Sequence, residues 1–196
     1  MTPYERAIAT LQNEKVDEFA AYPLVCGLQR RLLPANVTYK QWATDSDLCA
    51  QSYIEGFKKW KFPFTVTLED LSVTAHDLGA NVRMDSENTP FVDGHIIHDM
   101  EDYDKIQAPD VTQGRTGHLI RMNHKVVEGL KGDSFVIAFL EGPLLTLTQA
   151  GGAERVFMDM FSDPAPDGAD KDFLACMNPD SLEVLTGCKV EARMRD

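Results

Sequence analysis

The chain has 196 residues, of which 43% are hydrophobic, so it carries enough apolar material for the core of one large domain or two small ones. Its 19 basic and 31 acidic side chains give a formal charge of −12, which argues against nucleic acid as a partner because phosphate groups are held by clustered Lys and Arg. No stretch approaches the roughly 20 apolar residues that span a bilayer, and the N-terminal residues lack the basic and apolar regions of a signal peptide, so we expect a cytoplasmic protein that binds no membrane.

The N-terminal residues predict a helix. Thr2 can serve as its N-cap, Pro3 suits the first helical position, and Glu5 completes a capping box. An apolar run over residues 19–26 follows and ends at Gly27. This run predicts a first strand that is fully buried.

A second helix is predicted after Thr44, because Thr44 and Asp47 resemble a capping box. Its apolar stripe has the spacing of one helix face and consists of Cys49, Tyr53, Phe57 and Trp60. The β-branched and aromatic residues 64–68 then predict a second strand, with Glu69 and Asp70 at its C-terminal end.

A short helix that ends at Gly79 is predicted next, and the polar residues 81–110 predict a solvated loop. A third long helix is predicted over residues 115–131, where apolar residues recur on one face. The most hydrophobic run of the chain, residues 134–140, predicts a strand of a parallel sheet that is covered on both faces. It ends at Glu141-Gly142-Pro143.

The alternation of strands and helices predicts an α/β fold with parallel strands in βαβ units. Two architectures accommodate this order, a doubly wound sheet and a (β/α)₈ barrel of the TIM type. Neither of the phosphate-binding motifs G-x-G-x-x-G and G-x-x-x-x-G-K-[ST] occurs in the chain, which favours the barrel. From about Ser162 a cluster of Pro, Gly and Asp replaces the apolar pattern, and no further strand is predicted.

Functional residues of a parallel barrel lie where its strands end, which singles out Gly27, Asp70 and Gly142. Asp70 is the strongest candidate, because a carboxylate directly after a buried strand can hold N–H-rich ligands or act as a general base whose pKa is raised by burial. Equally, Asp70 can cap the helix that is predicted to begin at Leu71. Spacing alone leaves both interpretations open.

No metal site is predicted. His95 and His98 have a chelating spacing but lie in the polar loop without a nearby cysteine. His118 and His124 are six residues apart on one helix and point in different directions, so they cannot share an ion. The four cysteines form no C-x-x-C pair and are expected to be reduced thiols that behave as small hydrophobic residues; they are Cys26, Cys49, Cys176 and Cys188.

Five short segments follow one another in an order and spacing that are hard to obtain by chance. They are Thr2-Pro3-x-Glu5-Arg6, Tyr22-Pro23, the segment from Asp70-Leu71 to Gly79-Ala80, the segment from Gly142-Pro143 to Gly151-Gly152, and Asp163-Pro164. Together they resemble the superfamily that unites uroporphyrinogen decarboxylase with the methylcobamide:coenzyme M methyltransferases. The resemblance implies a (β/α)₈ barrel.

The resemblance covers residues 1–164, and residues 165–196 form a tail that departs from the family pattern. A complete barrel typically needs about 250 residues. We therefore expect a partial barrel that contains the N-terminal half only. Open sheet edges and apolar faces must be covered, so a homo-oligomer is also expected.

The resemblance implies different chemistry for the two branches of the superfamily. The decarboxylases carry two arginines that flank a glycine after the first strand, and an aspartate after the second strand. Aligning that glycine with Gly27 places Leu24 and Leu28 at the arginine positions and leaves Asp70 as the match to the aspartate. Loss of two guanidinium groups removes the bidentate recognition of substrate carboxylates, so the chain is closer to the methyltransferase branch.

In that branch the resemblance implies a zinc ion, held by an H-x-C pair and a distant cysteine in the second half of the barrel, which activates the accepting thiol. No H-x-C occurs in this chain. We expect corrinoid-dependent methyl transfer from a methylcobamide to a thiol, incomplete in this chain, with Asp70 as the catalytic residue. Gly27, Asp70 and Gly142 are expected to bind the substrate, which is a tetrapyrrole or a corrinoid, free or on a corrinoid protein.

Two alternatives stay open. The first is uroporphyrinogen decarboxylation, which needs no cofactor and would use Asp70 as the surviving functional residue. The second is a truncated barrel without catalysis of its own that acts as a binding or assembly module.

Overall fold

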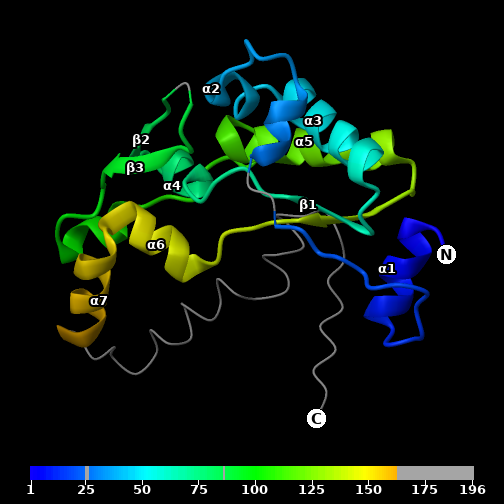
Figure 1. Cartoon of the computed structure of the whole chain (residues 1–196). Coiled ribbons are helices and arrows are strands. Elements are labelled where there is room, and N and C mark those ends of the chain that lie inside the picture. The colour runs from blue at the N-terminus through cyan, green and yellow to red at the C-terminus, as the bar shows by residue number, and fades with distance from the viewer. Residues whose placement is uncertain (25–26, 86, 163–196) are drawn as a thin grey trace.

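A computed structural model describes residues 1–24, 27–85 and 87–162 of the chain, which form helices, one pair of parallel strands and one antiparallel hairpin (Figure 1). Three of the expected features lie outside these residues. They are Cys26, the Asp163-Pro164 segment, and the tail expected over residues 165–196. Among the described residues, none of the helices combines the length and hydrophobicity needed to cross a bilayer.

The N-terminal helix forms as predicted. Helix α1 spans Pro3–Leu11, and the side chain of Thr2 accepts a hydrogen bond from the backbone N–H of Glu5 while the Glu5 carboxylate accepts one from the N–H of Thr2. Both halves of the capping box are therefore present, which satisfies two of the N–H groups that a helix start leaves unpaired.

The strand predicted over residues 19–26 is wrong for its described part. Residues 19–24 have no regular structure, and Phe19 is 89% exposed. Pro23 has no N–H to donate to a strand ladder. The segment contacts the sheet through side chains instead, since the ring of Tyr22 lies edge-on to Phe64 at 5.9 Å between centroids.

A layer of helices follows. It contains the 3₁₀ helix η1 (Leu28–Leu32) and the α-helices α2 (Tyr39–Trp42) and α3 (Ser46–Trp60). Asp45 rather than Thr44 is the N-cap of α3, because its carboxylate accepts hydrogen bonds from the next N–H groups. The predicted apolar stripe of α3 is buried except at Trp60, which is 37% exposed.

Two parallel strands form the centre of the structure. Strand β1 (Phe64–Thr67) pairs with β4 (Phe135–Ala138), with Phe64 opposite Phe135. Helices α4 (Val73–Asp77) and α5 (Gly114–Leu130) lie between them in the chain, which gives the predicted parallel βαβ connection. β1 is buried throughout, whereas β4 is only partly buried, so the prediction that residues 134–140 are covered on both faces is wrong for the described chain.

The predicted loop over residues 81–110 is partly wrong, because it contains an antiparallel hairpin. Strands β2 (Asn81–Arg83) and β3 (Phe91–Gly94) pair there, and the acidic run that follows forms the 3₁₀ helix η2 (Met100–Lys105). Exposed and half-buried residues alternate along both strands. Such short and largely exposed strands carry too weak a hydrophobic pattern to be predicted from the sequence.

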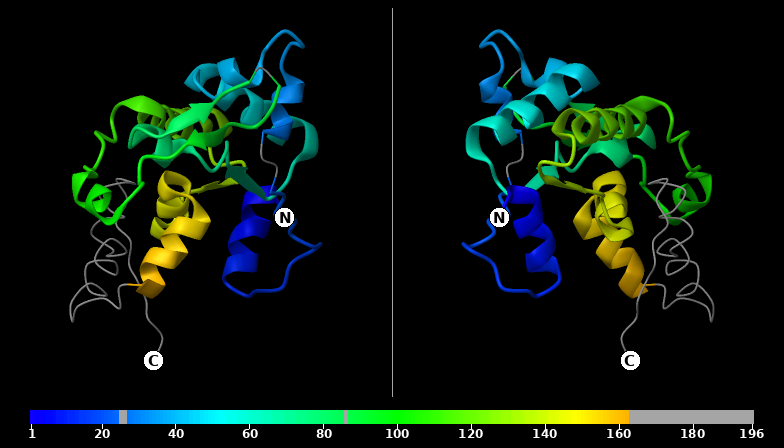
Figure 2. Two further views of the ribbon diagram at one scale, coloured as in Figure 1. Left: turned by 90° about the vertical axis from the view of Figure 1, so that its left-hand side faces the viewer. Right: turned by 90° about the vertical axis from the view of Figure 1, so that its right-hand side faces the viewer.

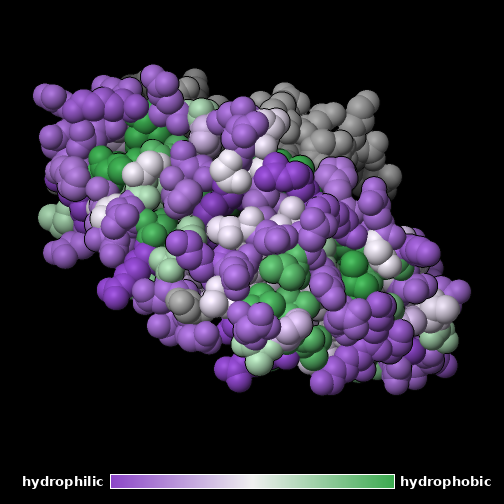
Figure 3. Space-filling view, turned by 90° about the horizontal axis from the view of Figure 1, so that it is seen from above, coloured by the Kyte–Doolittle hydropathy of each residue, from purple (hydrophilic) through white to green (hydrophobic). Residues whose placement is uncertain are grey.

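The main hydrophobic core lies within the helical layer that contains α3 and α5. Figures 1 and 2 show α3 and α5 on one side of the β1–β4 pair, whereas α1, α6 (Pro143–Gly151) and α7 (Ala153–Ser162) extend from the other side. The outer face of the α3 and α5 layer is mostly hydrophilic with small hydrophobic areas (Figure 3). Its inner side holds the main hydrophobic cluster, formed by Leu33, Val37, Tyr39, Trp42, Ala43, Cys49, Ala50, Tyr53, Phe57, Met122, Val126 and Leu130.

Candidate functional site

The carboxyl ends of β1 and β4 meet at one edge, as parallel pairing requires. Asp70 follows β1, and Gly142 follows β4 as the N-cap residue of α6. A hydrogen bond connects the two ends, since the backbone N–H of Val73 donates to Oε1 of Glu141 at 3.0 Å. The structure thus brings two of the three predicted site residues to the same edge.

Gly27 lies beside Tyr39, whose hydroxyl contacts the residue that follows β1 by two positions. The backbone of Gly27 has φ +67°, which favours glycine, and a Cβ atom at this position would stand 2.9 Å from the hydroxyl of Tyr39. That hydroxyl donates a hydrogen bond of 2.8 Å to the backbone carbonyl of Glu69. Gly27 therefore lies beside the side chain that contacts Glu69, and the role of the three predicted residues in binding a substrate stays a prediction.

Asp70 is buried and held by several donors. Its Oδ1 atom accepts hydrogen bonds from the backbone N–H of Ser72 at 2.9 Å and from the Ser72 hydroxyl at 2.6 Å. The guanidinium of Arg115 contacts both carboxylate oxygens, with Nη1 3.2 Å from Oδ1 and Nη2 bonded to Oδ2. Asp70 thus bonds to the turn before α4, which begins at Val73 and not at Leu71, and its role in chemistry stays a prediction.

Arg115 is a buried partner of Asp70 that the sequence pattern does not single out. Its side chain is 4% exposed, and it lies in the first turn of α5, where the helix dipole disfavours a cation. A basic residue at the start of a predicted helix could have indicated, from the sequence, that an acidic partner lies nearby. The partner itself could not be named, because Asp70 is distant in the sequence.

Asp77 on α4 fixes the start of α5. Its carboxylate oxygens accept hydrogen bonds from the backbone N–H groups of Arg115 at 2.9 Å and Thr116 at 2.7 Å. Burial acts to raise the pKa of Asp77, but these N–H donors outweigh it and lower the pKa below the usual value of 3.8. Asp77 therefore positions the helix turn that carries Arg115.

We expect Asp77→Ala to lower the free energy of unfolding by about 1–2 kcal/mol at neutral pH, as loss of a helix cap does. The pKa of Asp77 is lowered in the folded state, so its stabilisation is present above pH 3.8 and is lost as the pH falls through the folded-state pKa. Urea unfolding at several pH values measures this, with Asp104→Ala on the exposed face of η2 as the control. An equal loss of stability at neutral and strongly acidic pH would contradict the prediction.

Glu141 lies beside Asp70 at this edge. Burial raises the pKa of Glu141 above its usual value of 4.5, the N–H of Val73 acts to lower it, and the charge of Asp70 acts to raise it. Because burial disfavours the charged carboxylate, ionisation of Glu141 costs folding free energy as the pH rises above 4.5.

Replacement of Glu141 by glutamine is therefore expected to raise the melting temperature at mildly alkaline pH and to change it less at mildly acidic pH. The new amide oxygen can still accept the Val73 N–H. Thermal unfolding at both pH values gives the comparison, and Glu101→Gln at an exposed position serves as the control. A lower melting temperature at alkaline pH would show that the carboxylate charge stabilises the fold.

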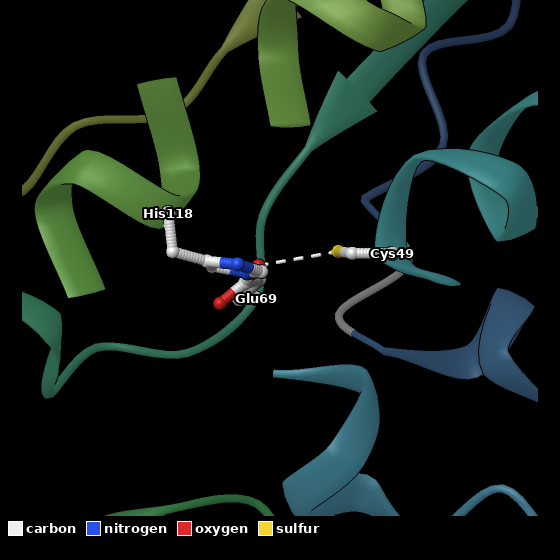
Figure 4. Close-up of side chains that lie close together, drawn as sticks. All are labelled: Cys49, Glu69 and His118. Carbon is white, nitrogen blue, oxygen red and sulfur yellow. Dashed lines mark hydrogen bonds and ion pairs between the residues drawn. The ribbon is translucent and has the colours of Figure 1, made fainter. Parts of the chain in front are cut away.

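A second cluster lies behind this edge and joins three elements (Figure 4). Oε1 of Glu69, directly after β1, lies 3.1 Å from Sγ of Cys49 on α3 and 2.5 Å from Nε2 of His118 on α5. All three residues are buried, and their ligand atoms lie within 4.8 Å of one another. Burial raises the pKa of the Cys49 thiol well above 9.0, so it remains protonated and donates to Glu69.

From the sequence, Cys49 is expected to be a small hydrophobic residue of the core, and His118 is considered as a metal ligand only together with His124. Two sequence features could have indicated this cluster. Cys49 lies in the apolar stripe of its helix, and Glu69 lies at the end of a predicted strand. His118 lies four residues before the buried Met122, on the core face of α5. Each signal is weak alone, because sequence spacing cannot show that three distant residues converge.

The parallel βα order and the polar residues at its carboxyl edge define part of a (β/α)₈ barrel. The family model described as Uroporphyrinogen decarboxylase (URO-D) matches residues 2–167, and the chain belongs to this family. Both expectations, the superfamily and the partial barrel, are confirmed.

Comparison with solved structures supports the fold. The chain is similar to a methyltransferase from Methanosarcina mazei, with a TM-score of 0.68 and 18% identity. The similarity covers 95% of this chain and 53% of that chain, so the chain spans about half the length of that protein. A glutamine–tRNA ligase of Bordetella avium is 55% identical over 31 residues, which is 16% of this chain and 5% of that protein, too little to indicate a shared domain.

Proposed function

We propose that the chain supplies the N-terminal half of a corrinoid-dependent methyltransferase site, in which a methyl group passes from a methylcobamide to a thiol. The observation that carries this proposal is the apolar character of Leu24 and Leu28, which flank Gly27 in the sequence. Leu24 and Leu28 stand at the positions that align with the decarboxylase arginines, and they are 59% and 52% exposed. At these two positions the chain presents hydrocarbon side chains. The nearby guanidinium of Arg30 lies over the ring of Tyr39 and donates a hydrogen bond to the carbonyl of Val37.

Charge supports the same conclusion. Uroporphyrinogen carries many carboxylates, which arginine binds best because its planar fork forms paired hydrogen bonds. Asp70 is already paired with the buried Arg115, so part of the hydrogen-bonding capacity of both side chains is used within the protein. A corrinoid has broad apolar faces and amide side chains, so its binding does not require arginine side chains that pair with carboxylates.

The activating zinc of the methyltransferase branch does not fit the residues of this chain. The ligand pair H-x-C does not occur in the sequence. We therefore give that ion no role among the residues of this chain, and we propose that residues outside it activate the thiol acceptor. The corrinoid, a corrinoid protein and a second copy of the chain stay predicted partners.

The direct test offers the purified protein two substrates in parallel. One reaction contains methylcobalamin, a thiol and added zinc, and demethylation is followed by the absorption spectrum of the corrinoid. The other contains uroporphyrinogen, and its porphyrin products are separated by chromatography. Methylcobalamin binding or demethylation supports the proposal, whereas formation of coproporphyrinogen favours decarboxylation, for which the retained Asp70 is the specific observation.

The substitution Leu28→Arg tests the apolar surface itself. We expect it to weaken methylcobalamin binding by about tenfold, because a charged side chain replaces apolar contact area worth about 1–2 kcal/mol. Quenching of tryptophan fluorescence by methylcobalamin measures the affinity. Leu11→Arg is the control, since Leu11 is similarly exposed at 59% but belongs to α1 and not to the segment around Gly27. An equal effect of the two substitutions would argue against a corrinoid site beside Gly27.

A further inference from the structure

We propose that Cys49, Glu69 and His118 form a binding site for one divalent ion of the zinc class. The three side chains come from α3, the end of β1 and α5, and they point toward one another in Figure 4. This cluster is distinct from the expected substrate residues Gly27 and Gly142. It also differs in residues and spacing from the H-x-C pair of the methyltransferase branch.

The kinds of donor atom select the ion. A cysteine sulfur and an imidazole nitrogen favour zinc and similar transition metals, whereas calcium and magnesium take oxygen ligands. Glu69 adds one carboxylate oxygen. Three protein ligands leave one position of a tetrahedral zinc ion for a water molecule.

Two of the three distances between ligand atoms lie close to those that a metal requires, and the third, from sulfur to nitrogen, is within 4.8 Å. In a tetrahedral zinc site the nitrogen and oxygen ligands stand about 3.4 Å apart, and sulfur and oxygen about 3.6 Å apart, from the usual bond lengths. In the structure the corresponding pairs are 2.5 Å and 3.1 Å apart. Each pair must therefore open by less than about 1 Å, and small side-chain rotations supply such a change.

The charges of the site also balance. Asp70 and Arg115 form an ion pair next to the cluster, so their charges cancel. When Cys49 releases its proton to solvent on binding, its thiolate and the Glu69 carboxylate carry two negative charges. A divalent ion neutralises them, which matters because uncompensated charge is costly in a buried site.

Surrounding groups already hold Glu69 in place. Its backbone carbonyl accepts the hydroxyl proton of Tyr39 at 2.8 Å, and its Oε2 atom lies 3.6 Å from Nη2 of Arg115. Such outer partners orient metal ligands and contribute to affinity. A bound ion would connect α3, β1 and α5, and so stabilise the half-barrel directly behind the edge that carries Asp70.

The test uses the reduced full chain after treatment with a chelator. Cobalt(II) is titrated as a spectroscopic substitute for zinc, and we expect one equivalent to produce a thiolate-to-cobalt charge-transfer band together with the visible bands of a tetrahedral ion. Added zinc should displace the cobalt and raise the melting temperature. These readouts are independent of methyl transfer, so they separate this proposal from the proposed function.

Two variants remove ligands with little change in shape. Cys49→Ser should abolish the charge-transfer band, and Glu69→Gln should weaken cobalt binding by more than about 100-fold, because even outer partners of metal ligands account for about 10–100-fold. His124→Ala, at an exposed position of the same helix, should leave binding unchanged. So should joint replacement of Cys26, Cys176 and Cys188 by serine. Circular dichroism confirms that each variant is folded.

Three results would overturn the proposal. They are no stoichiometric cobalt binding by the folded wild-type chain, a charge-transfer band that persists in Cys49→Ser, and a band that disappears when the other three cysteines are replaced. Any of them would leave the cluster as a hydrogen-bonded triad that joins the helices to the sheet.

Discussion

Arg115→Met should lower the free energy of unfolding by about 3–5 kcal/mol, because the buried carboxylate of Asp70 would lose its counter-charge. The Arg115 side chain is 4% exposed and contacts both oxygens of Asp70. Methionine fills much of the same volume, so the loss reports the charge and hydrogen bonds rather than a cavity. Urea unfolding at neutral pH measures the change.

A double-mutant cycle separates the ion pair from other effects of the substitution. Asp70→Asn combined with Arg115→Met should recover part of the lost stability, since no uncompensated charge remains buried. Arg121→Met is the matched control, because Arg121 is an exposed arginine on the same helix. Equal losses for Arg115→Met and Arg121→Met, or simple additivity in the cycle, would contradict a coupled buried pair.

The second large effect is expected at Trp42. Its side chain is fully buried, its ring packs against Tyr39 and Tyr53 at 5.2 Å and 6.2 Å between centroids, and its Nε1–H donates to the hydroxyl of Ser52 at 2.8 Å. Trp42→Ala should lower the free energy of unfolding by about 3–5 kcal/mol, because it leaves a large cavity in the centre of the hydrophobic cluster.

Trp60→Ala provides the comparison within the same protein. Trp60 ends α3, is 37% exposed and packs against Phe62. Its removal should cost less than half as much as that of Trp42, because part of its surface is already in water. Similar losses for the two tryptophans would contradict the prediction, and a small loss for Trp42→Ala would show that the cluster relaxes to fill the cavity. Trp42→Phe should give an intermediate loss, since it keeps much of the ring volume but removes the hydrogen bond to Ser52.

Capping residues, apolar stripes and runs of β-branched residues predicted much of the fold. The capping box of α1, the stripe of α3, strand β1 and the long helix α5 are each recognisable within a few neighbouring residues. Local periodicity reports them because one turn of helix or one strand face repeats every few positions. The parallel arrangement follows, since a helix between two strands carries the chain back to the same end of the sheet.

Other features depend on where the chain runs in space. Pro23 lies in an apolar segment that resembles a strand, yet residues 19–24 have no regular structure, and the ring of Tyr22 packs against Phe64 of β1. The β2–β3 hairpin forms from short polar strands whose pairing partners are chosen by the turn between them. Neither outcome is encoded in the hydrophobic pattern of a single segment.

In the candidate site, too, some residues could be predicted from the sequence and others only from the structure. The rule that functional residues follow the ends of parallel strands singled out Asp70 after β1 and Gly142 after β4, whereas Gly27 was chosen from a predicted strand that residues 19–24 do not form. The role of all three residues in a site stays a prediction. The partners of these residues became visible only in three dimensions. Arg115 reaches Asp70 across 45 positions, and Glu69 meets Cys49 and His118 from across 20 and 49 positions.

The sequence by itself therefore determined the α/β class, the parallel βαβ units and the family of this protein, because these depend on local patterns and on the order of short segments. Only the tertiary structure decided that Asp70 is paired with Arg115 and that a cysteine, a glutamate and a histidine converge. The physical reason is that burial makes polar groups find partners, while the choice of partner depends on how α3, β1 and α5 pack together.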